Sequence, residues 1–156
     1  MLEAWADDAI LPHYGELVTR TAALGMAVDA LCAGPSEARL ADARQAWMDA
    51  REPWEEAEVF TFGPLLDFPL RLLPLIEFRP TRVEAVAEII DGDQVLSLEE
   101  VRLFGAPGRG FPALEVLLFT TAVTDFVADE RRCQYSSVVA AALQANAQRL
   151  LQAWAP

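Results

Sequence analysis

The sequence contains no lysine, one histidine and two cysteines among its 156 residues. Without lysine, the chain cannot form a Schiff base through a side chain or supply the lysine of a phosphate-binding P-loop. His13 is the only imidazole, so a zinc site of the His-Glu-x-x-His type is excluded, and any Ser-His-Asp triad would have to use this residue. Cys32 and Cys133 are too few for a disulfide-rich scaffold or a four-cysteine metal site.

Basic residues are also scarce, since the sequence has 12 arginines against 24 acidic residues, which gives a formal net charge of −12. An acidic surface disfavours nucleic acid and anionic membranes as partners, because both require clustered basic residues. No apolar run approaches the roughly 20 residues of a membrane-spanning helix, and the residues after Met1 lack the basic start and apolar run of a signal peptide. A composition that is 53% hydrophobic predicts one folded domain over residues 1–156.

The spacing of apolar residues predicts an all-α fold. Steps of three, four and seven indicate long helices over 3–33, 36–62 and 129–154, and short ones over 81–90, 97–103 and 111–119. We expect Ser36 to cap the second helix and Pro53 to bend it. No segment alternates with period two, so the expected architecture is an up-down helical bundle.

Two features interrupt or extend this helical pattern. Four prolines between residues 64 and 80 exclude a regular helix there, although the segment is strongly apolar and should pack over the core or lie under a partner. The second helix carries an apolar seam of alternating large and small residues that suits close helix packing; its members are Leu40, Ala43, Trp47, Ala50, Trp54 and Ala57.

Three groups of residues could carry chemistry, and each also has a structural explanation. The glycine-rich loop at 108–110 enters a helix whose N–H groups could bind an anion, yet Pro112 and Glu115 equally suit a first helical turn. Glu55 and Glu58 share a helix face and could hold a cation, or could form a solvated face beside Arg51. His13 has no identifiable partner in the sequence and fits a structural role.

Several linked motifs resemble the imelysin family, and together they cover nearly the whole chain. They are Pro12 with Tyr14, Cys32 with Pro35, Ala43-Arg44-x-Ala46-Trp47, Arg51-Glu52-x-Trp54-x-x-x-Glu58-x-Phe60-x-Phe62-Gly63-Pro64, Arg109-Gly110-Phe111-Pro112-Ala113-Leu114-Glu115-x-Leu117-Leu118-Phe119, and Arg131-Arg132-Cys133-x-Tyr135. The resemblance implies a bacterial protein that is exported, periplasmic or lipid-anchored, and connected with iron uptake. Export would permit a Cys32–Cys133 disulfide, since these cysteines end the first helix and begin the last.

The chain departs from the family signature Gly-x-His-x-x-Glu, because Pro112 stands where the histidine belongs and only Gly110 and Glu115 remain. Proline can neither bind a metal nor transfer a proton. We therefore expect no catalytic residues and a non-enzymatic binding or accessory module. The alternatives are a metal-dependent peptidase, with His13 or a glutamate as base, and a purely structural partner domain whose acidic surface maintains solubility.

The resemblance also suggests a metal site and a partner. Glu55, Glu58 and Glu115 are the candidate ligands for iron or another hard cation, with Gly110 allowing a close backbone approach. Because family members have two helical bundles and this chain resembles the first, we expect a homodimer or a partner chain to cover an apolar face. The residues expected to line this face are Leu65, Leu66, Phe68, Leu70, Phe111 and Leu114.

Overall fold

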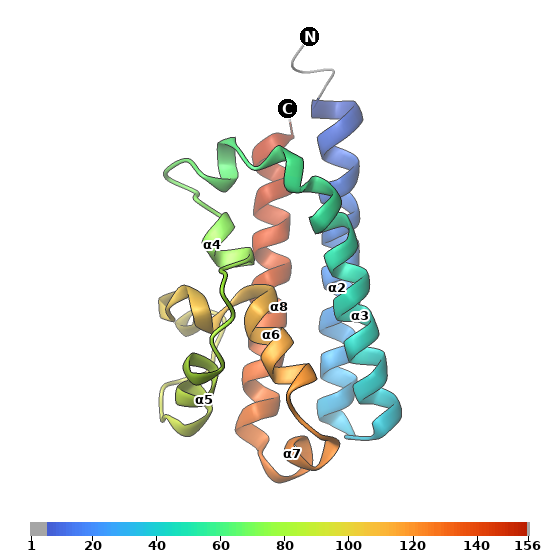
Figure 1. The fold of residues 1–156 in the computed structure, drawn as a ribbon, viewed down its shortest axis with the longest axis vertical. Coiled ribbons are helices and arrows are strands. Elements are labelled where there is room, and N and C mark those ends of the chain that lie inside the picture. Colours follow the sequence, from blue (N-terminus) through green and yellow to red (C-terminus); the bar gives the residue numbers. More distant parts are fainter. Residues whose placement is uncertain (1–5, 156) are drawn as a thin grey trace.

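Four helices form the bundle in the computed structural model, which describes residues 6–155 (Figure 1). They are α2 (Leu11–Ala33), α3 (Glu37–Glu56), α6 (Gly110–Phe119) and α8 (Glu130–Trp154). α2 packs along both α3 and α8, while α6 closes the bundle between α3 and α8. Successive members run in opposite directions, so the expected all-α, up-down bundle is confirmed, and the described residues contain no β-strand.

The turn η1 (Ala6–Ile10) leads directly into α2. Short helices connect the bundle helices: η2 (Ala57–Phe60), η3 (Gly63–Leu65), α4 (Leu73–Ile76), α5 (Val83–Asp91), η4 (Glu100–Leu103), η5 (Ala106–Gly108) and α7 (Val123–Ala128). Between α3 and α6 the chain crosses one end of the bundle and descends along its side through α4 and α5 (Figure 1). In the part of the chain that the structure describes, no helix is both long and apolar enough to cross a membrane.

The boundaries of α3 follow from local chemistry. The Ser36 side chain accepts a hydrogen bond from the Arg39 N–H at 3.2 Å, as expected of an N-cap. The predicted helix to residue 62 is too long, since α3 ends at Glu56 and continues as the tighter turn η2. Pro53 lies one turn before this change, and it lacks the N–H that a regular helix would need there. The first predicted helix reaches back to residues 3–5, which lie outside the described residues.

The apolar seam of α3 is confirmed, because all six of its members are buried. The Trp47 indole N–H donates to the Phe111 carbonyl oxygen at 3.1 Å, and the two rings meet edge to face. This contact joins α3 to the start of α6. A tryptophan needs such an acceptor to be buried without leaving its N–H unpaired.

The expectation about the uncovered apolar face is partly wrong. Leu65, Phe111 and Leu114 are buried within the chain's own core, where the proline-rich segment and α6 pack on α8. Leu70 is half-buried, whereas Leu66 and Phe68 remain exposed, Phe68 by 80%. The six-residue helix α7 was not predicted, since it is too short to show a helical period.

A disulfide joins Cys32, at the end of α2, to Cys133, in the first turn of α8, with the two Cα atoms 5.4 Å apart. That separation lies within the range that a disulfide requires. The bridge lies at the end of the bundle opposite the N and C termini (Figure 1). It fastens the two longest helices, which are also the first and last members of the bundle.

We expect the folded, unreduced protein to contain no free thiol, as a thiol titration would measure. Reduction, or replacement of both cysteines by alanine, should lower the free energy of unfolding by about 4–5 kcal/mol, because the bridge closes a long loop. The sequence separation of the two cysteines is 101 residues. Two titratable thiols in the native, unreduced protein would contradict this assignment.

Candidate functional site

The glycine-rich loop enters α6 through a backbone turn that only glycine adopts easily. Gly110 has φ +71°, and a Cβ at this position would collide with the carbonyl oxygen of Ile76. Pro112 follows in the first turn of the helix and is buried. The close backbone approach expected at Gly110 is therefore made to α4 of the same chain.

Glu115 lies in α6 beyond these residues and has a side chain that is 36% exposed. Its carboxylate accepts a hydrogen bond from Arg79 Nη1 at 2.8 Å and another from the Thr81 hydroxyl at 3.3 Å. Gly110 thus brings α6 against α4, and Glu115 connects α6 to the segment between α4 and α5. In this chain the motif joins two parts of the fold.

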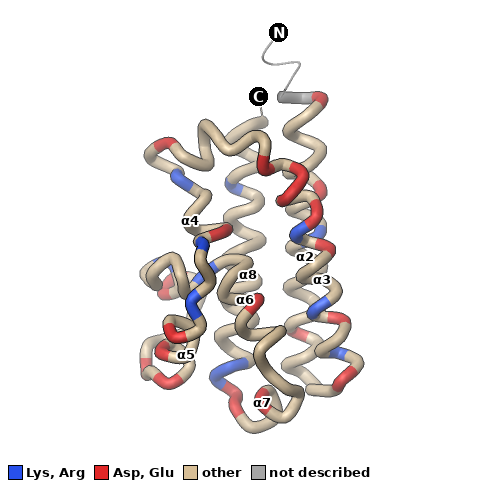
Figure 2. Tube along the Cα trace, viewed as in Figure 1, with Lys and Arg blue, Asp and Glu red and all other residues tan. Residues whose placement is uncertain are grey.

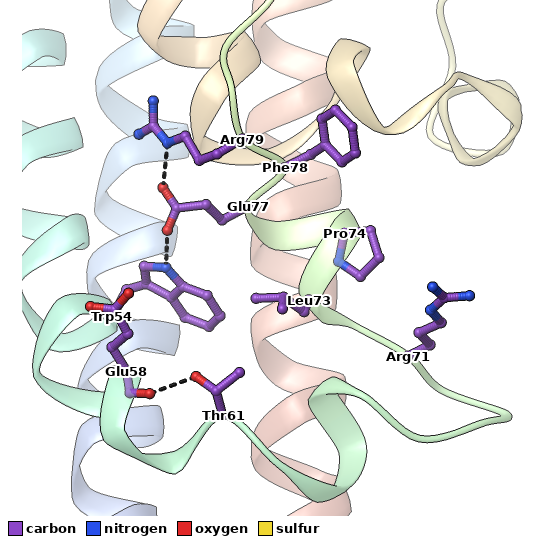
Figure 3. Close-up of a pocket in the computed structure, with 9 residues that line it drawn as sticks. All are labelled: Trp54, Glu58, Thr61, Arg71, Leu73, Pro74, Glu77, Phe78 and Arg79. Atoms are coloured by element: carbon purple, nitrogen blue, oxygen red, sulfur yellow. Dashed lines mark hydrogen bonds and ion pairs between the residues drawn. The ribbon is translucent and has the colours of Figure 1, made fainter.

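Glu77, immediately after α4, is the most heavily bonded carboxylate near this motif, and only 15% of its side chain is exposed. It accepts hydrogen bonds from the Trp54 indole and, at 3.0 Å, from Arg79 Nε (Figure 3). It also accepts one from Arg51. Burial alone would raise the pKa of Glu77, but these hydrogen bonds and the charge of Arg51 outweigh burial and lower it. Glu77 therefore stays ionised inside the fold.

Arg51 connects this carboxylate to α3 and to the core. Its guanidinium lies 5.4 Å from the centre of the Trp47 ring and 5.5 Å from that of Phe111. It also donates to Glu55 at 2.9 Å through Nη2. The side chains Glu55, Arg51, Glu77, Arg79 and Glu115 therefore form a line of alternating charge, which we call the arginine–glutamate chain.

Two hollows flank the arginine–glutamate chain and separate the candidate metal ligands. One, of about 380 Å³, is lined by Glu55 and Glu115 together with Trp47, Met48, Arg51, Glu52 and Arg79. The other, of about 480 Å³, contains Glu58 and is drawn in Figure 3; its remaining lining residues are Trp54, Thr61, Arg71, Leu73, Pro74, Glu77, Phe78 and Arg79. The structure thus brings Glu55 near Glu115 and leaves Glu58 in the neighbouring hollow.

The three candidate metal ligands do not converge on one point in this arrangement. Among residues 6–155 no three His, Cys, Asp or Glu side chains are grouped so that they could hold one cation. Glu55 and Glu115 already accept hydrogen bonds from Arg51 and Arg79, whose positive charges occupy the place a cation would take. His13 pairs instead with Glu56, with Nδ1 and Oε2 3.2 Å apart.

Sequence reasoning missed Glu77 and Arg79, the two residues at the centre of this network. Their partners in α3 and α6 lie 23 to 36 residues away in the chain, so no local period reveals those contacts. One signal was present, because Glu77 is the only acidic residue between Asp67 and Glu84, in a largely apolar, proline-rich segment whose other charges are all arginines. A single carboxylate in such a segment indicates a specific partner.

Comparison with known proteins gives a consistent set of relatives. A family model described as Imelysin matches residues 10–156. Iron-regulated protein A of Synechococcus elongatus is 29% identical over 98% of this chain and 39% of its own length. A solved structure assigned as an iron-regulated protein A precursor, from Parabacteroides distasonis, matches with a TM-score of 0.78 and 27% identity over 96% of this chain and 43% of that one.

A second solved structure supports the fold alone. It is an imelysin-like protein from Psychrobacter arcticum, with a TM-score of 0.83 and 23% identity over 96% of this chain and 47% of that protein. The chain therefore spans less than half the length of each of these relatives.

Replacing Glu77 by glutamine should destabilise the protein at neutral pH by about 1–3 kcal/mol, because a buried charged acceptor is lost. The pKa of Glu77 is lower in the folded protein than its ordinary value of 4.5. The contribution of the carboxylate to stability is thus complete above that value and is lost as the pH falls through the folded pKa. The difference in the free energy of unfolding between the wild type and E77Q should therefore become smaller as the pH falls through that acidic range.

Denaturant unfolding at neutral and acidic pH would measure both effects. Glu55→Gln is the matched control, because the Glu55 side chain is 60% exposed and its pairing with Arg51 is a surface one. Its loss should cost about 0–1 kcal/mol. Equal losses for the two variants, or a difference for E77Q that does not change with pH, would contradict the central role of Glu77.

Proposed function

The chain belongs to the imelysin family, and on that basis we propose that it is a non-enzymatic binding or accessory module in bacterial iron handling. The link to iron rests on the names of two relatives, both called iron-regulated protein A. Because this chain spans about two fifths of their length, whatever those proteins do as wholes is carried over here only as part of the proposal.

The observation that carries the non-enzymatic assignment is the state of the family motif. Pro112 occupies the histidine position of Gly-x-His-x-x-Glu and is buried in the first turn of α6. Its ring offers neither a ligand nor a proton. Glu115, the remaining polar member, is engaged by Arg79 and Thr81. A peptidase reaction would need a metal-activated water and a base at the same place.

We place any bound hard cation, iron or another, at the carboxylates that flank the arginine–glutamate chain. Glu55 and Glu115 are the donors that share a hollow, and Glu58 lies in the adjoining one. A cation there must compete with Arg51 and Arg79 for the same oxygens, so we expect weak binding. Carboxylate oxygens suit hard cations such as iron(III), calcium or magnesium.

The same proposal locates the protein outside the cytoplasm, in the periplasm or another exported setting. The Cys32–Cys133 bridge supports this location, because structural disulfides persist mainly in oxidising compartments.

Calorimetric titration with calcium and with iron(II) under anaerobic conditions tests the metal part of the proposal. We expect a weak heat of binding that disappears in E55Q/E115Q, because both donors are then neutral. Glu37→Gln is the control, since Glu37 is an exposed acid at the opposite end of α3. No heat with either metal would favour a purely structural partner domain. Peptide hydrolysis by the wild type that a chelator abolishes would contradict the non-enzymatic assignment.

A homodimer is the assembly that we propose, formed through apolar side chains left exposed near the proline-rich segment. These are Val59, Phe62, Leu66 and Phe68, with exposed fractions of 78%, 47%, 47% and 80%. Burying each large side chain would contribute about 1.5–3 kcal/mol to association. The two acidic chains repel each other, but salt screens this repulsion beyond about 8 Å, so the burial outweighs it. A two-fold interface would cover this cluster on both copies.

Light scattering at micromolar concentration should give twice the monomer mass of 17.1 kDa. Phe68→Asp should shift the population to monomer, because it introduces a charge into the buried contact. Leu103→Asp is the matched control, since Leu103 is 77% exposed but belongs to a different segment. A monomer mass for the wild type at high protein and salt concentration would exclude the dimer.

A further inference from the structure

The two longest stretches of this chain without an acidic residue both contain arginines. One runs from residue 101 to 114 and includes Arg102 and Arg109, and the other runs from residue 131 to the end and includes Arg149. The whole chain has 24 acidic residues, so these gaps stand out. Figure 2 shows the contrast, with acidic residues crowded at the C-terminal end of α3 and none along α8 beyond its beginning.

The fold brings these two stretches together around a hollow of about 260 Å³. Three guanidiniums and one amide line it, from Arg102, Arg109, Arg149 and Asn146. The other lining residues are apolar: Leu75, Val101 and Ala142. Among residues 6–155, no aspartate or glutamate lines the hollow. Within the described residues none of its three arginines forms an ion pair with a carboxylate, unlike Arg51 and Arg79.

The Arg109 side chain is held in place, but one of its N–H donors has no hydrogen-bond partner among the described residues. Its Nη1 donates to the Arg102 carbonyl oxygen at 2.8 Å, which fixes the direction of the side chain. Its Nε is buried and has no hydrogen-bond partner among the described residues. Burial lowers the pKa of Arg109, as expected for a charge removed from water without a counter-charge. Buried donors are nearly always paired, so an unpaired one requires an explanation.

Arg149 approaches from α8 and is also oriented, because its Nη1 donates to Asn146 Oδ1 at 3.0 Å. The amide and the guanidinium are one turn apart on the same helix. Neutral hydrogen-bond partners thus orient Arg109, between η5 and α6, and Arg149, in α8, and both side chains line one hollow. Arg102 lines the same hollow. Neutral acceptors leave the positive charges uncompensated.

We propose that this hollow binds a small oxyanion that carries at least two negative charges, of the polycarboxylate or phosphate class. Guanidinium groups recognise both through paired N–H···O bonds, and three of them match a multivalent anion better than a monovalent one. The volume is below the roughly 300–1,000 Å³ of pockets for drug-sized ligands, which restricts the ligand to a small molecule. The site is separate from the arginine–glutamate chain and does not depend on the function proposed above.

Calorimetry on the whole chain tests the site with citrate, succinate, inorganic phosphate and acetate as probes. We expect citrate, succinate or phosphate to bind at least about tenfold more tightly than acetate, and binding to weaken as salt rises. A preference for citrate and succinate would assign the site to carboxylates, and a preference for phosphate would assign it to phosphates. The side-chain NMR signal of Arg109 Nε–Hε should shift with the same affinity.

Two variants separate binding from folding. Arg149→Gln removes an exposed guanidinium and should weaken binding by about tenfold or more without changing the melting temperature. Arg109→Met keeps the apolar stem but removes the unpaired charge, so binding should be lost while the melting temperature is kept or raised. Arg20→Gln is the control, since Arg20 pairs with Glu16 on the surface of α2.

Three results would overturn the proposal. They are the absence of binding by every probe at millimolar concentration, equal affinity for acetate and for the multivalent anions, and binding that Arg149→Gln leaves unchanged. The last result would place the anion elsewhere on the molecule.

Discussion

The buried carboxylate of Glu77 is the interaction on which the rest of this structure depends. It lies where the proline-rich segment reaches the bundle, and its hydrogen bonds from Arg51 and Trp54 hold that segment against α3. Arg51 can serve this carboxylate because two aromatic rings, those of Trp47 and Phe111, pack against its guanidinium and hold it in place. Arg79 donates hydrogen bonds both to Glu77 and to Glu115, and so connects this carboxylate to α6. A segment with almost no regular structure is thereby positioned by charge and by aromatic packing.

The sequence predicts the parts of this fold that depend on local repetition. The seam of α3, the Ser36 cap and the long helices all follow from residues within a turn or two of one another. Glu77, Arg79 and the hollow around Arg109 depend on contacts between distant parts of the chain, which no period reveals. Of the expected group, Glu55 and Glu115 share a hollow, whereas Glu58 lines the neighbouring one because α3 changes to a tighter turn before it.

The signature motif of the imelysin family has a packing role in this chain. Gly110 allows α6 to begin against the backbone of α4, and Glu115 fastens the same helix to the segment that follows. Pro112 suits the first turn of a helix and has no other chemistry to offer. In this chain the glycine and the glutamate of the motif therefore both maintain the fold.

The position of the disulfide determines how the molecule would bear a mechanical load. Both ends of the chain emerge at one end of the bundle, whereas the Cys32–Cys133 bond lies at the other (Figure 1). Tension applied between the two ends would travel down α2, cross the covalent bond and return along α8. Residues 33–132 lie off this path, and they include the arginine–glutamate chain and most of the anion-binding hollow. Stretching that peels α2 from α8 as far as the bridge would therefore not pull directly on the arginine–glutamate chain, whereas it would pull on the hollow through Asn146 and Arg149 of α8.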